Sequence, residues 1–345
     1  MTQHTGEAAT LIEVLARSYQ LDTTSLRPGP AGTATANYLA TDREGRQWFV
    51  KTYPSQADLD DERRALDLSE FARLGGIPAP PVLRSVTGAL LTQDGPVALS
   101  VSAFVAGSWT AEGGLGGDLY ATVGELVGRL HRLLAGHPAG PPRPGPTDRV
   151  CRFDQATRRL DRLLDGDPDR TGGSPFARWA RDAARQRRAD LASVRKLLAE
   201  LPPTLTMQTI HGDLASPNLL LTEAGIAALI DFRPPSPQSP AWELGRIVLD
   251  PRTVLADAAW PAGLASAVAA YHATNPALPI EDLIAAPRLA AGYLCCSVYP
   301  LSVALEHPTA ATPSLYRYAR ARHDATSVLV ERTDEAEQLL RDLLG

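Results

Sequence analysis

Three polar side chains in one short stretch of the chain are candidates for chemistry. The segment 205–232 reads LTMQTIHGDLASPNLLLTEAGIAALIDF and holds Asp213, Asn218 and Asp231 among mostly apolar strand residues. A carboxylate and an amide oxygen together suit a hard cation such as Mg²⁺, which takes oxygen ligands. A second carboxylate suits a general base that accepts a proton from an attacking hydroxyl. This combination of residue types indicates phosphoryl transfer.

A hairpin within this segment predicts that the three side chains converge. If residues 223–225 form a three-residue turn, Thr222 pairs with Ile226 and Asn218 pairs with Ile230. The aspartate that follows Ile230 then lies at the same end of the hairpin as Asn218.

Phosphoryl transfer also needs a cation on the nucleotide phosphates, and the chain has a candidate. Only Lys51 and Lys196 are lysines among 34 basic residues. Since the chain otherwise uses arginine for positive charge, a lysine suggests a role that needs its compact ammonium group. Lys51 lies in a predicted strand and Glu62 in the next helix, which fits the lysine–glutamate pair of such sites.

Structural roles for the same residues remain open alternatives. Asp213 and Asn218 can form turns around Pro217 through their own side chains. Lys51 can be a strand-surface lysine. Glu62 shares its helix with five other acidic residues, so a solvated acidic face is the simpler interpretation of that glutamate.

Periodicity and turn signals divide the chain into a strand-rich part and a helical part. Before residue 106 we expect strands at 36–41 and 46–53 and helices at 8–19 and 58–74. After it we expect mainly helices, at 118–135, from Ser174 to about 200, and at 262–272, 281–305 and 314–343. The Pro/Gly-rich stretch 137–147 is predicted to be an irregular loop.

Composition excludes several classes of protein. The chain has 345 residues, 44% of them hydrophobic, and a net charge of -5, which disfavours disorder and a broad nucleic-acid surface. We find no apolar run of membrane-spanning length and no signal peptide at the N-terminus. Three cysteines, two of them adjacent, suit a reducing cytoplasm.

Common catalytic motifs are missing from the sequence. Neither lysine follows a glycine, so there is no P-loop, and no GxGxxG opens a helix after a strand. There is also no GxSxG, and no two histidines are four residues apart.

The motifs that remain resemble those of the aminoglycoside phosphotransferase superfamily, which is related to the protein kinases and includes choline and homoserine kinases. They are HGD-x4-N (211–218), IDF (230–232), VGRLHRLLAG (127–136) and the hinge-like LSVSAFVAG (99–107). The resemblance implies an α+β, protein-kinase-like bilobal fold. The N-terminal nucleotide-binding lobe, an antiparallel sheet with one main helix, would span 1–105. The larger, mostly helical C-terminal lobe, with the catalytic hairpin and the substrate site, would span 106–345.

The same resemblance implies roles for individual residues. The nucleotide would be ATP with Mg²⁺, and Gly29 and Gly32 are candidates for a phosphate loop. His211 would brace the active-site loop without transferring a proton. The implied site consists of Asp213 as catalytic base, Asn218 and Asp231 as Mg²⁺ ligands, Lys51 and Glu62 at the ATP phosphates, and the backbone of Ala103 and Val105 at adenine.

The sequence departs from the family pattern after IDF. Arg233 stands for a common glycine, Ser239-Pro240 for Asp-Pro, and Glu243 for a later aspartate. In the family these aspartates chiefly support the active-site loop, so the departures leave the loop geometry and the substrate open.

The resulting hypothesis is an ATP- and Mg²⁺-dependent kinase that acts on a hydroxyl of a small molecule, with an aminoglycoside-type antibiotic as the first candidate. Twelve acidic and nine basic residues follow Phe232, an acidic bias that permits a polycation without demanding one. A metabolite kinase of the homoserine or choline type and a nucleotide-binding pseudokinase are the alternatives. The lack of HRD, DFG and APE disfavours a protein kinase. We expect a cytoplasmic monomer or homodimer that binds neither nucleic acid nor membrane.

Overall fold

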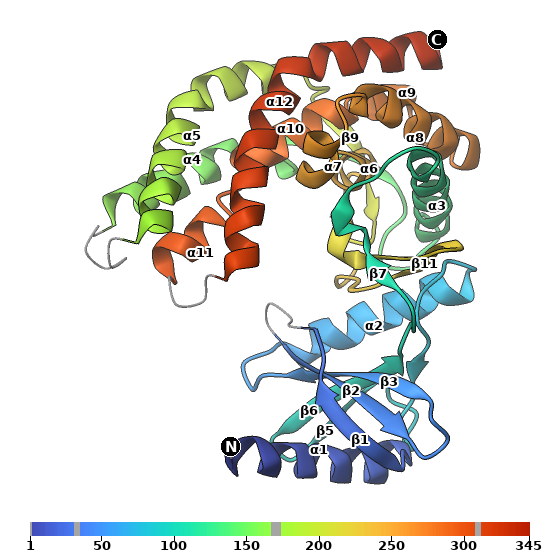
Figure 1. Ribbon diagram of the computed structural model, residues 1–345. Helices are drawn as coiled ribbons and strands as arrows, with labels where there is room; N and C mark the ends of the chain where they lie inside the picture. The colour runs from blue at the N-terminus through green and yellow to red at the C-terminus, as the bar shows by residue number, and fades with distance from the viewer. Residues whose placement is uncertain (1, 31–34, 167–173, 308–311) are drawn as a thin grey trace. The chain divides into compact units, whose positions relative to one another are not determined.

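The chain forms two compact units, which Figure 1 shows as a ribbon. The computed structural model describes residues 2–30, 35–166, 174–307 and 312–345. Unit 1 comprises Met1–Ala111 and His211–Ser236, and unit 2 comprises Glu112–Ile210 and Pro237–Gly345. The predicted hairpin segment therefore belongs to the same unit as the N-terminal strands. The functional lobes 1–105 and 106–345 stay a prediction.

Unit 1 is built on a six-stranded antiparallel sheet. The strands run in the order β1-β2-β3-β6-β4, and β5 also pairs with β6; β10, β11 and β7 form a second, three-stranded sheet. The predicted strands at 36–41 and 46–53 are confirmed as β2 and β3, whereas β1 was not predicted. The elements of unit 1 are α1 (Thr2–Tyr19), β1 (Thr23–Pro28), β2 (Ala36–Asp42), β3 (Gln47–Tyr53), α2 (Leu59–Leu74), β4 (Val82–Leu83), β5 (Leu91–Asp94), β6 (Val97–Ala103), β7 (Trp109–Thr110), β10 (Leu219–Thr222) and β11 (Gly225–Leu229).

The two faces of this sheet are covered by different helices, as Figure 1 shows for α1 and α2. Val50 packs in one core cluster with Leu15 of α1. Tyr53 belongs to a second cluster, against Leu66 of α2. Because side chains alternate along a strand, Lys51 shares the face of Tyr53 and α2.

Unit 2 is mainly helical, with one small sheet in the order β12-β9-β8. Helices α3 and α8 approach closely, since a Cβ added at Gly124 would lie 2.0 Å from the carbonyl oxygen of Ala267. The elements of unit 2 are α3 (Leu119–Leu134), β8 (Arg143–Pro146), α4 (Phe153–Asp165), α5 (Pro175–Ala199), β9 (Thr204–Thr209), β12 (Pro237–Gln238), α6 (Pro240–Val248), α7 (Pro251–Ala256), α8 (Trp260–Thr274), α9 (Ile280–Ile284), α10 (Ala286–Cys296), α11 (Leu301–Glu306) and α12 (Pro313–Leu344).

Most predicted helices of unit 2 are confirmed, and two predictions are wrong. The long helix starts where expected, because the Ser174 side chain accepts a hydrogen bond from the Ala177 N–H. The stretch 137–147 is not wholly irregular: Arg143–Pro146 pairs antiparallel with β9. Its two prolines are compatible with a strand because β8 is at the edge of its sheet. The helix predicted at 281–305 is divided into α9, α10 and α11, with non-helical backbone at 297–300.

One stretch, Ala286–Glu306, is long and apolar enough to pass for a membrane span, contrary to our reading of the sequence. It covers α10 and α11, and 61% of it is buried inside the protein. Core helices that pack against other helices have the same composition, so this stretch is weak evidence for a membrane segment.

A buried polar network joins three helices of unit 2. His131 of α3 is fully buried; its Nδ1 lies 3.0 Å from the Tyr271 hydroxyl and its Nε2 lies 3.0 Å from Oε2 of Glu243. The Asn275 side chain donates to the Tyr271 hydroxyl oxygen, so the hydroxyl proton can be donated to Nδ1 of His131. Nε2 of His131 then carries the ring proton and donates it to Glu243. Glu243, which stands for a family aspartate, is thus held by a histidine.

We expect His131→Ala to destabilise the protein by about 3–5 kcal/mol, because it removes a fully buried ring and, with it, a hydrogen bond to the buried Glu243 carboxylate. Urea unfolding, compared through the midpoint at constant slope, measures the loss. His307→Ala is the matched control, since His307 is exposed. Equal stability of the two variants would contradict the importance of the network.

Candidate active site

The hairpin of β10 and β11 has a shorter turn than predicted, but the residues paired at its open end are the predicted ones. Thr222 pairs with Gly225 rather than with Ile226, so the turn has two residues. A bulge then shifts the register between Leu220 and Leu221. Beyond it the Ile230 N–H donates to the Asn218 carbonyl at 3.0 Å, which is the predicted pair.

His211 holds the loop that carries Asp213. It is fully buried, its Nε2 lies 3.0 Å from the Ile230 carbonyl, and its Nδ1 accepts from the Asp213 N–H at 3.3 Å. Its ring also packs on Phe232, with 4.1 Å between ring centroids. Both ring nitrogens are therefore used to tie the loop to the end of the hairpin, as expected for a bracing histidine.

Two backbone conformations in this region have positive φ. Gly212 has φ of +87°, and a Cβ there would lie 2.8 Å from Cβ of Arg233, so both conformation and space favour glycine. Asp231 has φ of 61°, which a short polar residue tolerates better than other non-glycine residues. Strain of this kind concentrates at functional sites.

Asn218 is oriented by the Asp213 loop. Its Nδ2 donates to the main-chain carbonyl of Asp213 at 2.8 Å. With Nδ2 fixed in this bond, the amide oxygen Oδ1 is the atom left to act as a cation ligand. The predicted proximity of Asp213 and Asn218 is present, and Asp231 directly follows the residue paired with Asn218.

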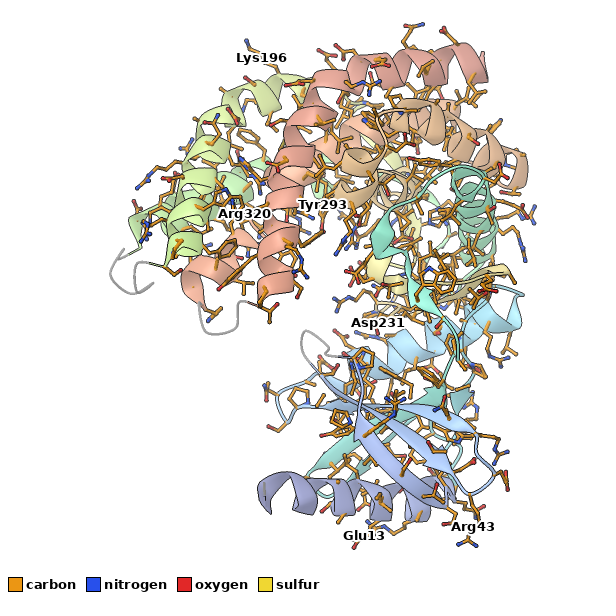
Figure 2. All side chains as sticks on the ribbon, viewed as in Figure 1. Glu13, Arg43, Lys196, Asp231, Tyr293 and Arg320 are labelled. Atoms are coloured by element: carbon orange, nitrogen blue, oxygen red, sulfur yellow. The ribbon has the colours of Figure 1, made fainter. Side chains whose placement is uncertain are left out.

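Lys51 lies in an ion pair with Asp231. Its Nζ is 3.0 Å from Oδ1 of Asp231, and 54% of the Asp231 side chain is exposed, so the carboxylate is open to solvent as well. Figure 2 labels Asp231. Strand β3 and the hairpin end, 180 residues apart in sequence, thus contribute opposite charges to one place.

Glu62, predicted as the partner of Lys51, lies in the first turn of α2 and is half-buried. Burial is the largest cause that raises the pKa of Tyr53, and the negative charges of Glu62 and Asp231 raise it further. Lys51 Nζ lies 5.9 Å from the centroid of the Tyr53 ring. Tyr53 is therefore the common neighbour of these three charged groups, and the Lys51–Glu62 pair stays a prediction.

Arg233 is a site residue that the sequence analysis notes only as a departure from the family pattern. Its Nη2 lies 3.0 Å from Oδ2 of Asp213, and its main-chain N–H donates to the His211 carbonyl at 2.9 Å. The side chain is 62% exposed, against 26% for Asp213. Its position two residues after Asp231, in the segment beside the HGD loop, is the sequence signal that could have identified it.

The backbone groups predicted to bind adenine lie at the end of β6. The Ala103 N–H donates to the Pro81 carbonyl at 3.0 Å, and the Val105 carbonyl accepts from the Ser108 hydroxyl at 2.7 Å. Their role at adenine stays a prediction. Of the phosphate-loop candidates, Gly29 donates to Asn37 at 2.8 Å, and Gly32 lies outside the described residues.

The oxygen ligands fit a metal that is held mainly by a nucleotide. In the part of the chain that the structure describes, no group of three or more His, Cys, Asp or Glu side chains is placed to hold a metal ion. Mg²⁺ in kinase sites takes one or two protein oxygens and completes its shell with phosphates and water. Asn218 Oδ1 and the exposed Asp231 carboxylate supply that kind of donor.

Comparison with solved structures shows the fold. The chain matches a crystal structure of spectinomycin phosphotransferase in complex with ADP and spectinomycin (TM-score 0.66, 14% identity, 95% of this chain and 98% of that chain covered). It also matches a microcompartment-associated aminopropanol kinase (TM-score 0.58, 20% identity, 96% and 98% covered). A third match is a thermostable mutant of an aminoglycoside phosphotransferase with AMP-PNP and hygromycin B (TM-score 0.54, 15% identity, 94% and 97% covered). The predicted α+β, protein-kinase-like fold class is confirmed.

Sequence comparison gives the family. No curated protein matches the chain. The family model described as "Phosphotransferase enzyme family" matches residues 25–286, which include Lys51, the HGD loop and the hairpin. The chain belongs to the phosphotransferase enzyme family.

Proposed function

We propose that the protein transfers the γ-phosphoryl group of ATP to a hydroxyl of a small molecule, with Mg²⁺ as cofactor. The observation that carries this proposal is the pairing of Lys51 with Asp231 at the hairpin end that also holds Asn218. A lysine for phosphates and two oxygen ligands for a cation are thereby gathered in a chain of phosphotransferase ancestry.

In the proposed reaction Asp213 is the base. Its carboxylate accepts the proton of the acceptor hydroxyl while the oxygen forms a bond to the γ-phosphorus, and the bond between that phosphorus and the bridging oxygen of ADP breaks. Lys51 would bind the phosphates, and Asn218 and Asp231 would hold Mg²⁺. Bound Mg²⁺ neutralises charge on the phosphate oxygens. The 3.0 Å contact puts the Arg233 guanidinium beside the base, where it can stabilise negative charge during transfer.

The nature of the nucleotide is supported by the similar structures. Those of spectinomycin phosphotransferase contain ADP or AMP, and the hygromycin enzyme contains AMP-PNP. By analogy of fold, we propose that this chain also binds an adenine nucleotide. We propose a cytoplasmic location because ATP is available there.

The acceptor class is open between an antibiotic and a metabolite. Similar structures include kinases named for spectinomycin, amicoumacin and hygromycin, and others named for aminopropanol, glucosamine and ethanolamine. We keep the aminoglycoside-type antibiotic of the sequence hypothesis as one arm of the test and the metabolite as the other.

An ADP-release assay with Mg²⁺ and ATP tests the function. Aminoglycosides and other hydroxylated antibiotics form one set of acceptors, and homoserine, choline, sugars and sugar acids form the other. We expect acceptor-dependent ADP release with one set and none without acceptor. ADP release that is independent of every acceptor would instead make the protein an ATPase and overturn the proposal.

We expect Arg233→Ala to lower kcat roughly tenfold, because one positive charge beside the transferred group is lost. The melting temperature should hardly change, since an exposed ion pair contributes at most about 1 kcal/mol. Arg233→Lys should recover part of the loss. The measurement is steady-state ADP release together with thermal unfolding. An unchanged or higher kcat would mean that Arg233 competes for Asp213 instead of assisting it.

A further inference from the structure

Several acidic residues at the C-terminus of unit 2 have arginine partners. Glu337 and Asp334 both contact Arg288, at 2.8 Å and 3.0 Å. Glu335 contacts Arg332 at 2.7 Å. Three of the acids that give this region its negative charge therefore each have an ion pair with an arginine of the same unit.

A cluster of opposite character lies where α6, α10 and α12 meet. We define the Tyr293 cluster as Trp242, Arg246, Tyr293 and Arg322. The Arg322 guanidinium lies 5.2 Å from the centroid of the Tyr293 ring, and that of Arg246 lies 5.7 Å from the same ring and 5.5 Å from Trp242. Trp242 meets Tyr293 edge to face, with 5.3 Å between centroids. Figure 2 shows Tyr293 beside α12.

This cluster contains buried donors without acceptors. The Arg322 side chain belongs to a residue only 4% exposed, and its Nη1 donates to the Tyr318 hydroxyl at 3.2 Å. Among the residues that the structure describes, nothing accepts from Nε or Nη2 of Arg322, or from Nε1 of Trp242, a residue 5% exposed. Three N–H donors of one cluster are thus withdrawn from solvent without a partner in the protein, which is rare for buried polar groups.

The surroundings add a further positive charge. Arg187 of α5 is 5% exposed, and burial and then the charge of Arg322 lower the pKa of Arg187 to about 10. Burial raises the pKa of Cys295 to about 11 and that of Cys296 to about 12, so both neighbouring thiols stay neutral near pH 7. The acid that acts on Arg187 is Asp190, which is exposed on the same helix.

Two explanations exist for a buried guanidinium with unused donors. If it served only to pack the core, an apolar side chain of similar size would do so without the cost of desolvating a charge. If it binds a ligand, the unused donors are the binding groups. Arginine is suited to carboxylate and phosphate because its planar fork donates two parallel hydrogen bonds. The rings of Trp242 and Tyr293 add a flat apolar surface beside those donors.

We infer that the Tyr293 cluster is a binding site in unit 2 for a small molecule that carries a carboxylate or phosphate group. This inference goes beyond the proposed function and does not depend on it. Nε and Nη2 of Arg322 and Nε1 of Trp242 donate to the oxyanion, and the aromatic rings contact the apolar part of the molecule.

The test is oxyanion binding in the absence of ATP. The probes are malonate, as a carboxylate, and inorganic phosphate, each titrated against sodium chloride at equal ionic strength and followed by thermal shift and calorimetry. We expect at least one probe to stabilise the wild-type protein beyond chloride, and the probe that does so identifies the anion. In Arg322→Met the affinity should fall at least about tenfold, the equivalent of one charge-assisted hydrogen bond. Arg320→Met, two residues along the same helix and exposed, should bind as the wild type does.

Two further readouts separate binding from packing. Without the probe, Arg322→Met should melt no lower than the wild type, because the substitution removes a buried charge that forms no ion pair with any described residue. Trp242→Phe keeps an aromatic side chain but lacks the indole N–H. A several-fold weaker affinity in this variant supports the inference if Arg322→Met does not fold. Equal stabilisation by chloride and both probes, or unchanged affinity in Arg322→Met or Trp242→Phe, would overturn the inference.

The outcome is independent of catalysis. Probe binding that depends on Arg322 in a protein that shows no ADP release would support the oxyanion site and count against the kinase. Turnover of an acceptor by a protein that binds neither probe beyond chloride would keep the kinase and overturn the oxyanion site.

Discussion

Asp213→Asn should lower kcat by roughly 10²–10⁴-fold and leave ATP affinity unchanged, because it removes the base and little else. Asn218 is held by the main-chain carbonyl of residue 213, and His211 by its main-chain N–H, so the loop does not depend on the carboxylate. The lost ion pair with Arg233 is partly exposed and contributes little to stability. Steady-state ADP release and ATP titration measure the two quantities.

Asp67→Asn is the matched control for this substitution, since Asp67 is an exposed aspartate of α2. It should behave as the wild type does. If Asp213→Asn retained most of its turnover, Asp213 could not be the base, and the assignment of the HGD loop as the catalytic loop would be withdrawn.

Asp231→Asn should raise the Mg²⁺ concentration needed for half-maximal turnover roughly 10–100-fold. The substitution removes the negative charge of a proposed metal ligand and keeps the side-chain size. Asparagine tolerates the φ of 61° at this position, whereas alanine would add backbone strain to the effect. A Mg²⁺ titration of ADP release at saturating ATP gives the value for each variant.

The same control, Asp67→Asn, shows how an aspartate-to-asparagine substitution outside the site affects the Mg²⁺ requirement and the stability. Thermal unfolding should be nearly equal in the two variants, because the Lys51–Asp231 ion pair is half-exposed. An unchanged Mg²⁺ requirement in Asp231→Asn would exclude Asp231 as a metal ligand.

The hairpin illustrates how much of the site the sequence could predict. Two apolar runs on either side of turn residues located both strands, and the predicted pairing of Asn218 with Ile230 is confirmed. The turn was wrong by one residue, and the bulge at Leu220/Leu221 compensates for it. Bulges leave no clear sequence signal because they depend on packing against the rest of the unit.

Contacts between distant segments were harder to predict than elements. We predict that Glu62, on the next helix, is the carboxylate partner of Lys51. The ion pair that the structure shows is with Asp231, which lies 180 residues away in the sequence. Sequence spacing sets which face of a strand a residue occupies, but not which distant side chain reaches it. The contact of Arg233 with Asp213 was missed for the same reason.

The Tyr293 cluster could not be predicted from any motif. Its members come from three helices and are up to 80 residues apart, so no local pattern relates them. A charge count of the C-terminal region gave a weak acidic bias. The ion pairs of Arg288 and Arg332 could not be predicted from that count, because a sum of charges does not say which acids have a partner.

The most direct test of the candidate site is a calorimetric titration of the protein with ATP, with and without Mg²⁺. Wild type should bind ATP at one site, more tightly with Mg²⁺, and Lys51→Met should bind roughly tenfold more weakly or worse, because it loses a charged contact to the phosphates. Lys51 is only part of an exposed ion pair, so the variant should remain folded. A wild-type protein that binds no ATP in either condition would contradict the kinase account.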